Sequence, residues 1–67
     1  MQEYQHRVVQ EKADLDEKIA KLNAFLGTQD FFKIVPDAAE RSRLTSQYGA
    51  MTEYSRILGE RIENFTE

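Results

Sequence analysis

The sequence predicts an all-α protein: an antiparallel two-helix hairpin with a short apolar connector, which assembles into a homo-oligomeric helical bundle. Three observations predict this. Apolar residues recur at helical spacing in two long segments, a glycine and a proline bracket the stretch between them, and the 67-residue chain has no cysteine. We expect one helical-hairpin domain over residues 1–67, with a helix over 2–26, a connector over 27–36 and a second helix over 37–65.

The segment 2–26 has the periodicity of one amphipathic helix. No glycine or proline interrupts it, and its apolar residues recur in steps of three, four and seven: Tyr4, Val8, Leu15, Ile19, Leu22 and Leu26. Acidic residues precede basic ones by four positions, the order that stabilises a helix, at Glu3–Arg7, Asp14–Lys18 and Glu17–Lys21. Gly27 follows, and we expect it to adopt the left-handed conformation that ends many helices.

The connector over 27–36 is more apolar than a free loop. Thr28 is expected to cap a short turn, and three large apolar residues follow it: Phe31, Phe32 and Ile34. We expect these three side chains to fold back and cover the end of the hairpin. Pro36 disfavours the helical conformation in the residue before it, so the second helix begins after it.

The segment 37–65 has the strongest periodicity. Asp37 precedes Glu40 by three residues, the spacing of a capping box. Gly49 and Gly59 each cost this helix up to about 1 kcal/mol relative to alanine, so we expect another backbone or a flat ligand to approach there. Four apolar residues fall seven apart, as in a coiled-coil seam: Leu44, Met51, Leu58 and Phe65.

The composition leaves self-association as the means by which so small a chain can form a stable fold. Two helices touch along one narrow line and enclose no core, and chains of this size are marginal as monomers. With no cysteine and one histidine, the chain has neither a disulfide nor a zinc site of Cys and His ligands, and we expect no metal or other cofactor. The residues expected at the oligomer interface lie on the two apolar stripes: Leu15, Leu22, Leu44, Met51, Leu58 and Phe65.

Charge and hydropathy disfavour two classes of partner. The chain carries 9 basic and 12 acidic residues, for a net charge of −3, and no segment is a basic patch that would bind duplex DNA. Apolar runs are only two or three residues long, so no membrane span or secretory signal is expected. The absence of cysteine fits a cytoplasmic protein.

No catalytic residue is expected. His6 is the only histidine and lies near a helix end, without a serine or cysteine motif that would use it as a base. The acidic pairs Asp14 with Glu17 and Glu60 with Glu63 fit exposed, ion-paired helix faces better than an acid and base pair. Enzyme activity is therefore not expected.

Polar residues interrupt both apolar stripes. Glu11 and Lys12 lie midway between Val8 and Leu15 in the first helix, and Gln47 and Arg61 occupy inward-leaning positions in the second. One interpretation is an ion pair between Arg61 and Glu11 that fixes the register of the helices. The other is that these residues line a polar pocket between hairpins.

Aromatic and basic residues form a candidate ligand site. Tyrosine can stack on a base and arginine can hold a phosphate, and glycine lets a ring approach the backbone. The residues that could serve a nucleotide in this way are Tyr48, Tyr54, Arg56 and Arg61, with Tyr4 and Arg7 brought from another subunit. The alternative is that the tyrosines belong to the helix interface and the arginines are solvated.

Two stretches of the sequence carry a family resemblance: YQHRVVQEKADLDEKIAKLNAF over 4–25 and QYGAMTEYSRIL over 47–58, followed by Arg61 and Ile62. They are similar to a family of very short phage and prophage proteins related to a crAss-like phage gene product. The resemblance implies a virus-encoded accessory protein in the bacterial cytoplasm. Small phage accessory proteins commonly counter host defence, and some unrelated ones sequester nucleotide messengers of bacterial immunity.

Three functions are therefore weighed. The first is a non-catalytic oligomer that holds a nucleotide-type signal between subunits. The second is an interaction module whose exposed apolar stripe binds a host or phage protein. The third, a catalytic role, predicts turnover that depends on His6 or an acidic pair, and we expect none.

Overall fold

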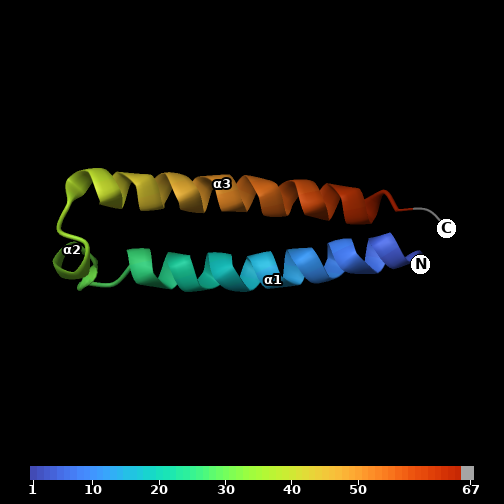
Figure 1. The fold of residues 1–67 in the computed structure, drawn as a ribbon, viewed down its shortest axis with the longest axis horizontal. Coiled ribbons are helices and arrows are strands. Elements are labelled where there is room, and N and C mark those ends of the chain that lie inside the picture. Colours follow the sequence, from blue (N-terminus) through green and yellow to red (C-terminus); the bar gives the residue numbers. More distant parts are fainter. Residues whose placement is uncertain (66–67) are drawn as a thin grey trace.

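The computed structural model describes residues 1–65 and contains two long helices that run side by side in opposite directions (Figure 1). Helix α1 spans Glu3–Leu26 and helix α3 spans Ala38–Glu63. A single helical turn, α2 at Phe31–Ile34, lies in the connector, and the described residues contain no strand. The predicted all-α hairpin is confirmed, and its helix bounds lie within two residues of those expected.

The hairpin is long and thin. Its principal extents are 49 × 15 × 14 Å and its radius of gyration is 15.2 Å, whereas a compact chain of this length would have about 11 Å. Its accessible surface of 5027 Å² exceeds the roughly 4,400 Å² expected of a compact protein of this mass. The two helices therefore leave a large surface in water for so short a chain.

Apolar burial is concentrated at a few points along the seam between α1 and α3. Leu58 is fully covered and Val8 is 6% exposed. Leu58 therefore has no surface left for contact with a second subunit, because the packing of α1 against α3 covers its side chain completely. The other five residues expected at an oligomer interface keep part of their surface: Leu15, Leu22, Leu44, Met51 and Phe65.

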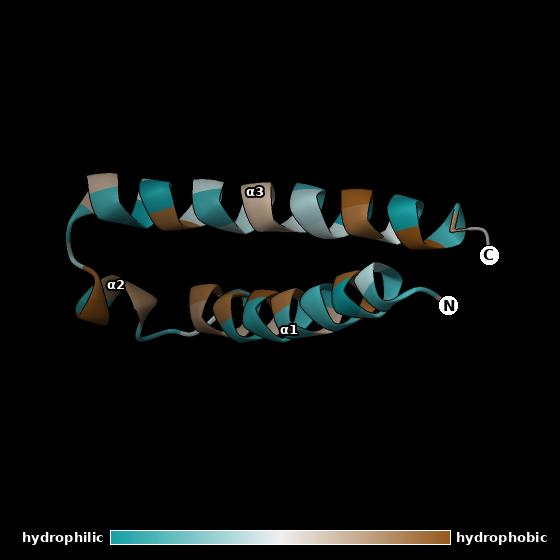
Figure 2. Ribbon diagram, turned by 45° about the vertical axis from the view of Figure 1, so that its right-hand side comes forward, coloured by the Kyte–Doolittle hydropathy of each residue, from teal (hydrophilic) through white to brown (hydrophobic). Residues whose placement is uncertain are grey.

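Aromatic side chains are in contact at both ends of the hairpin. At the open end the rings of Tyr4 and Phe65 meet edge to face, with their centroids 5.8 Å apart. At the closed end Phe31 is buried against Phe25, at 5.3 Å between ring centroids. In the hydropathy colouring α2 is mostly brown, the hydrophobic end of the scale (Figure 2).

Only one of the three apolar connector residues covers the end of the hairpin, which corrects the expectation. Phe32 and Ile34 are 65% and 63% exposed. A single helical turn points its side chains in different directions, so Phe31 packs inward while these two face outward. The guanidinium of Arg41 lies over the Phe32 ring, 4.6 Å from its centroid, and also donates to the carbonyl of Val35.

The helix ends differ in detail from those expected. Gly27 has φ −89° and ψ 0°, a right-handed conformation in place of the left-handed one predicted. Thr28 does not cap α2; its hydroxyl donates to the carbonyl of Phe25 at 2.8 Å. Asp37 does cap α3, accepting from the amide of Ala39 at 3.1 Å. Glu40 accepts from the guanidinium of Arg43 instead of completing a capping box.

A polar cluster bridges the seam, and it is not the expected one. Arg61 and Glu11 form no ion pair with each other among the described residues. Instead the Lys12 ammonium donates to the Ser55 hydroxyl at 3.0 Å and to the Asp16 carboxylate at 2.8 Å, and the Ser55 hydroxyl donates to Asp16. Lys12 and Ser55 each follow the apolar stripe in steps of three and four, which places them inside the seam.

This cluster predicts a loss of stability in acid. The hydrogen bond from Lys12 and then that from Ser55 hold the pKa of Asp16 below its ordinary value, although desolvation acts in the opposite direction. Because the pKa is lower in the folded state, the contribution is complete above the ordinary carboxyl pKa and is lost as pH falls through the folded value. We expect the melting temperature to fall in that range.

The matched variant is Asp16→Asn, followed by thermal melts between neutral pH and pH of about 2. It should be less stable than the parent at neutral pH and should lose less on acidification. Identical pH profiles for the two proteins would show that the cluster makes no contribution.

The two glycines of α3 occupy different surroundings. A Cβ at Gly49 would have no neighbour within 4 Å, whereas one at Gly59 would lie 3.3 Å from Lys12 Cε. At Gly59 the close neighbour is therefore a side chain of the same hairpin. Apart from its own helix backbone, no group of residues 1–65 comes within 4 Å of a Cβ placed at Gly49.

Gly49→Ala is therefore expected to raise the free energy of unfolding by about 0.5–1 kcal/mol, the ordinary gain of alanine over glycine inside a helix. Gly59→Ala should gain less, because the Lys12 side chain must shift to make room. Urea denaturation followed by circular dichroism measures both. Destabilisation by the Gly49 variant would indicate a close neighbour from outside the chain.

Candidate functional site

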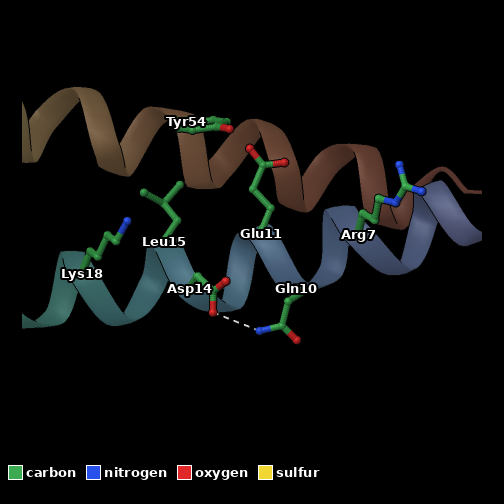
Figure 3. A pocket seen from close by; sticks show the side chains of 7 residues that line it. All are labelled: Arg7, Gln10, Glu11, Asp14, Leu15, Lys18 and Tyr54. Carbon is green, nitrogen blue, oxygen red and sulfur yellow. Dashed lines mark hydrogen bonds between the residues drawn. The ribbon is translucent and has the colours of Figure 1, made fainter.

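A shallow groove of about 510 Å³ runs along one flank of the seam (Figure 3). Six of the seven residues that line it belong to α1 and one belongs to α3. They are Arg7, Gln10, Glu11, Asp14, Leu15, Lys18 and Tyr54. Apart from the adjacent pairs 10/11 and 14/15, the α1 residues follow one another in steps of three or four, so one face of the helix presents them together.

Between its two basic side chains the groove contains both apolar surface and carboxylates. Figure 3 shows Leu15 and Glu11 pointing from α1 toward α3, where the ring of Tyr54 lies. Tyr54 is 44% exposed, so part of its side chain is open to solvent. Arg7 and Lys18 stand at opposite ends, eleven residues apart, which is about 16 Å along the helix axis.

The charged side chains of the groove differ in their ion-pair and hydrogen-bond partners. Arg7 forms an exposed ion pair with Glu3 at 3.0 Å, as predicted. Asp14 accepts from the Gln10 amide at 2.9 Å and forms no pair with Lys18 in the described chain, contrary to expectation. Within residues 1–65, the side chains of Glu11 and Lys18 have no ion-pair or hydrogen-bond partner. One negative and one positive group of the groove are therefore available.

The structure brings together only two of the six predicted ligand residues, Tyr54 and Arg7. Tyr48 lies half-buried in the seam, and Tyr4 packs against Phe65 at the open end. Arg61 is exposed but does not line the groove.

Arg56 is held by acidic neighbours on its own helix. Its guanidinium contacts the carboxylates of Glu53 and Glu60, the latter at 2.6 Å. Hydrogen bonding and charge attraction from Glu53, followed by the charge of Glu60, raise the pKa of Arg56 above its already high ordinary value. Two carboxylates thus satisfy the guanidinium, which leaves it less suited to holding a phosphate than Arg7 or Lys18.

Five groove residues were not among the predicted ligand residues: Gln10, Glu11, Asp14, Lys18 and Leu15, the last of which is expected at the oligomer interface. A signal for them exists in the sequence. Arg7, Glu11, Asp14 and Lys18 recur in steps of four, three and four, which marks a charged helix face bordering the apolar stripe. Of these four, Arg7 is a predicted ligand residue, and Glu11 is predicted either to pair with Arg61 or to line a polar pocket. The spacing of Asp14 and Lys18 predicts only an exposed ion pair.

Other kinds of site are not assembled in the described part of the chain. No three His, Asp or Glu side chains of residues 1–65 converge in a way that could hold a metal ion. His6 is exposed and lies outside the groove. Over the same residues, neither long helix is apolar enough along its length to cross a membrane.

The fold and the groove define a small helical-hairpin protein with an open groove lined by charged side chains. The chain belongs to the Sequestin family, whose model matches residues 2–64. The family's name is compatible with a role in binding or sequestering a partner. No curated protein and no solved structure matches the chain.

Proposed function

We propose that this chain is a phage-encoded accessory protein that acts in the cytoplasm of the bacterial host. As a non-catalytic homo-oligomer it sequesters a nucleotide-type immune signal between its subunits. The proposal assigns no catalytic residue and no cofactor. Membership of the Sequestin family supports the sequestering role, and the groove supports the chemistry of the ligand.

The observation that carries the proposal is the placement of Tyr54 between two cations. A half-exposed tyrosine ring offers a face on which a base can stack. Arg7 can fork onto a phosphate, and Lys18 offers a second positive charge at the far end of the groove. The volume of about 510 Å³ falls within the range of small-molecule sites.

The ligand is proposed to lie between subunits because one hairpin covers only one side of it. Small-molecule sites usually bury most of the ligand surface, and an open groove on two helices does not. A second subunit over the groove would cover the exposed side of the ligand. It would also slow the dissociation of the ligand, the rate in which most differences in affinity arise.

The test is a thermal-shift screen of the purified protein against cyclic and linear nucleotides, each well above micromolar concentration. We expect at least one to raise the melting temperature, because a ligand that binds only the folded state stabilises it. Calorimetry then gives stoichiometry, and mass spectrometry of the recovered ligand should find it intact. No shift with any nucleotide would contradict the proposed ligand class, and a converted ligand would contradict the absence of catalysis.

A second function is favoured by a different observation. Phe32 and Ile34 are exposed together at the closed end of the hairpin, an apolar surface suited to binding a host or phage protein. Replacing both by serine should abolish the capture of such a partner and leave nucleotide binding unchanged. Leu58, on the apolar stripe of α3, is wholly buried and therefore cannot belong to such a surface.

A further inference from the structure

The groove carries two opposite charges placed almost symmetrically about an apolar residue. Glu11 precedes Leu15 by four positions and Lys18 follows it by three, and all three line the groove. Neither charged side chain has an ion-pair partner among the described residues. Seven residues separate them, about 10 Å along α1, which is too far for a direct pair within the helix.

A two-fold axis near Leu15 would satisfy both charges at once. If a second α1 lies antiparallel against the first with this residue at the centre, Glu11 faces Lys18 of the second copy. Symmetry repeats the contact on the other side, as in any isologous interface. The charge pattern of α1 around Leu15 is thus complementary to the charge pattern of a second α1 that runs in the opposite direction.

The second helix is compatible with the same axis. Tyr54 reaches into the groove from α3 at the level of Leu15 (Figure 3). A rotation that places α1 against the α1 of a second copy also places α3 against its counterpart, so the two Tyr54 rings would meet near the axis. Leu15 is half-buried and Tyr54 is 44% exposed, so both retain surface that a partner can cover.

We propose that a second copy of this chain covers the groove with two-fold symmetry, with Leu15 and Tyr54 near the axis and reciprocal Glu11–Lys18 ion pairs on either side. The occupant of the face is therefore this chain itself. A face 49 Å long and about 15 Å wide offers about 700 Å² per copy, near the 800 Å² per partner of a standard stable interface.

This inference deepens the proposed function and rests on it in one respect: it names the subunit that covers the groove. The pairing describes the ligand-free protein, because a bound nucleotide would replace the partner's contacts at Lys18 and Tyr54. The pairing itself needs no nucleotide, since it depends on charge and apolar surface within the protein. It can therefore be measured with the protein alone.

The experiment uses the charge reversals Glu11→Lys and Lys18→Glu, singly, mixed in equal amounts, and combined in one chain. Sedimentation at low salt gives the self-association constant of each sample. Each single variant places like charges together twice per dimer, so its self-association should weaken by about ten-fold to a hundred-fold. The equal mixture should form a heterodimer, and the doubly substituted chain should associate like the parent.

Exposed charges elsewhere on α1 provide the control. Glu17 and Lys21 form an ion pair at 3.2 Å outside the groove, so reversing either should leave association unchanged. Circular dichroism checks that every variant is helical. A monomeric parent, single reversals without effect, or a mixture that fails to pair would each overturn the proposal. If the parent binds nucleotide while the reversals leave association unchanged, the pairing fails and the proposed function stands.

Discussion

Leu58→Ala is expected to unfold a large fraction of the protein under conditions where the parent is folded. Leu58 is the most buried apolar side chain, at 0% exposure, and truncating a buried leucine costs about 2–5 kcal/mol. A chain of this length has a total stability of roughly 3–10 kcal/mol. Urea denaturation monitored by helical circular dichroism should place the midpoint far below that of the parent.

The matched control is the neighbouring residue on the same helix. Ile57 is 43% exposed, so Ile57→Ala removes a similar side chain that contributes much less burial. Its midpoint should shift by a small fraction of the shift at Leu58. Equal losses at the two positions would mean that Leu58 is not the centre of the seam.

Arg7→Gln is expected to weaken nucleotide binding by about ten-fold to a hundred-fold, the ordinary cost of losing a hydrogen bond to a charged group. Arg7 lines the groove at the end opposite Lys18, and its present partner is an exposed glutamate that a phosphate could replace. Stability should hardly change, because exposed ion pairs contribute little. Calorimetric titration with the strongest ligand from the nucleotide screen measures the effect.

Arg43→Gln controls for the loss of a positive charge. Arg43 is 66% exposed and paired with Glu40 at 2.7 Å, but it lies outside the groove. Its replacement should leave affinity within about two-fold of the parent, since rim and remote charges act mainly on the association rate. If both variants lost affinity equally, the effect would be one of net charge and the groove would not be the phosphate site.

The two long helices could be predicted because their information is local and repeated. In 2–26 and 37–65 the three- and four-residue steps continue for six or seven turns, so one misplaced residue does not change the assignment. The antiparallel arrangement follows from the short connector. The course of the connector was less predictable, because only packing decides that Phe31 turns inward and Phe32 outward.

The hydrogen-bonded cluster of Lys12, Asp16 and Ser55 could not be predicted, for a different reason. The predicted pair of Arg61 with Glu11 rests on opposite charge and on the position of each residue in its own helix. The contact that forms depends in addition on the register of one helix against the other. Lys12 is long enough to carry its charge past Gly59 to Ser55, and a hydroxyl is a less obvious partner than a carboxylate. Sequence spacing placed Lys12 at the seam but could not select its partner.

The candidate site was predictable in part. Residue types suggested tyrosine and arginine, but helix geometry sorts them by face. At 100° per residue, Tyr54 and Tyr48 lie on different sides of α3, so one reaches the groove and the other enters the seam. Arg56 could have been set aside from sequence alone, since Glu53 and Glu60 stand three and four residues from it.

The central claim is that one hairpin is not stable without a second chain. The most direct test is sedimentation equilibrium of the unmodified chain over a wide dilution series, with helicity recorded on the same samples. The excess surface of the hairpin predicts association, and the proposed two-fold pairing predicts a folded species at an even multiple of 7.8 kDa, with helicity lost as dilution separates the subunits. A fully helical, cooperatively melting 7.8 kDa particle at every concentration would contradict it.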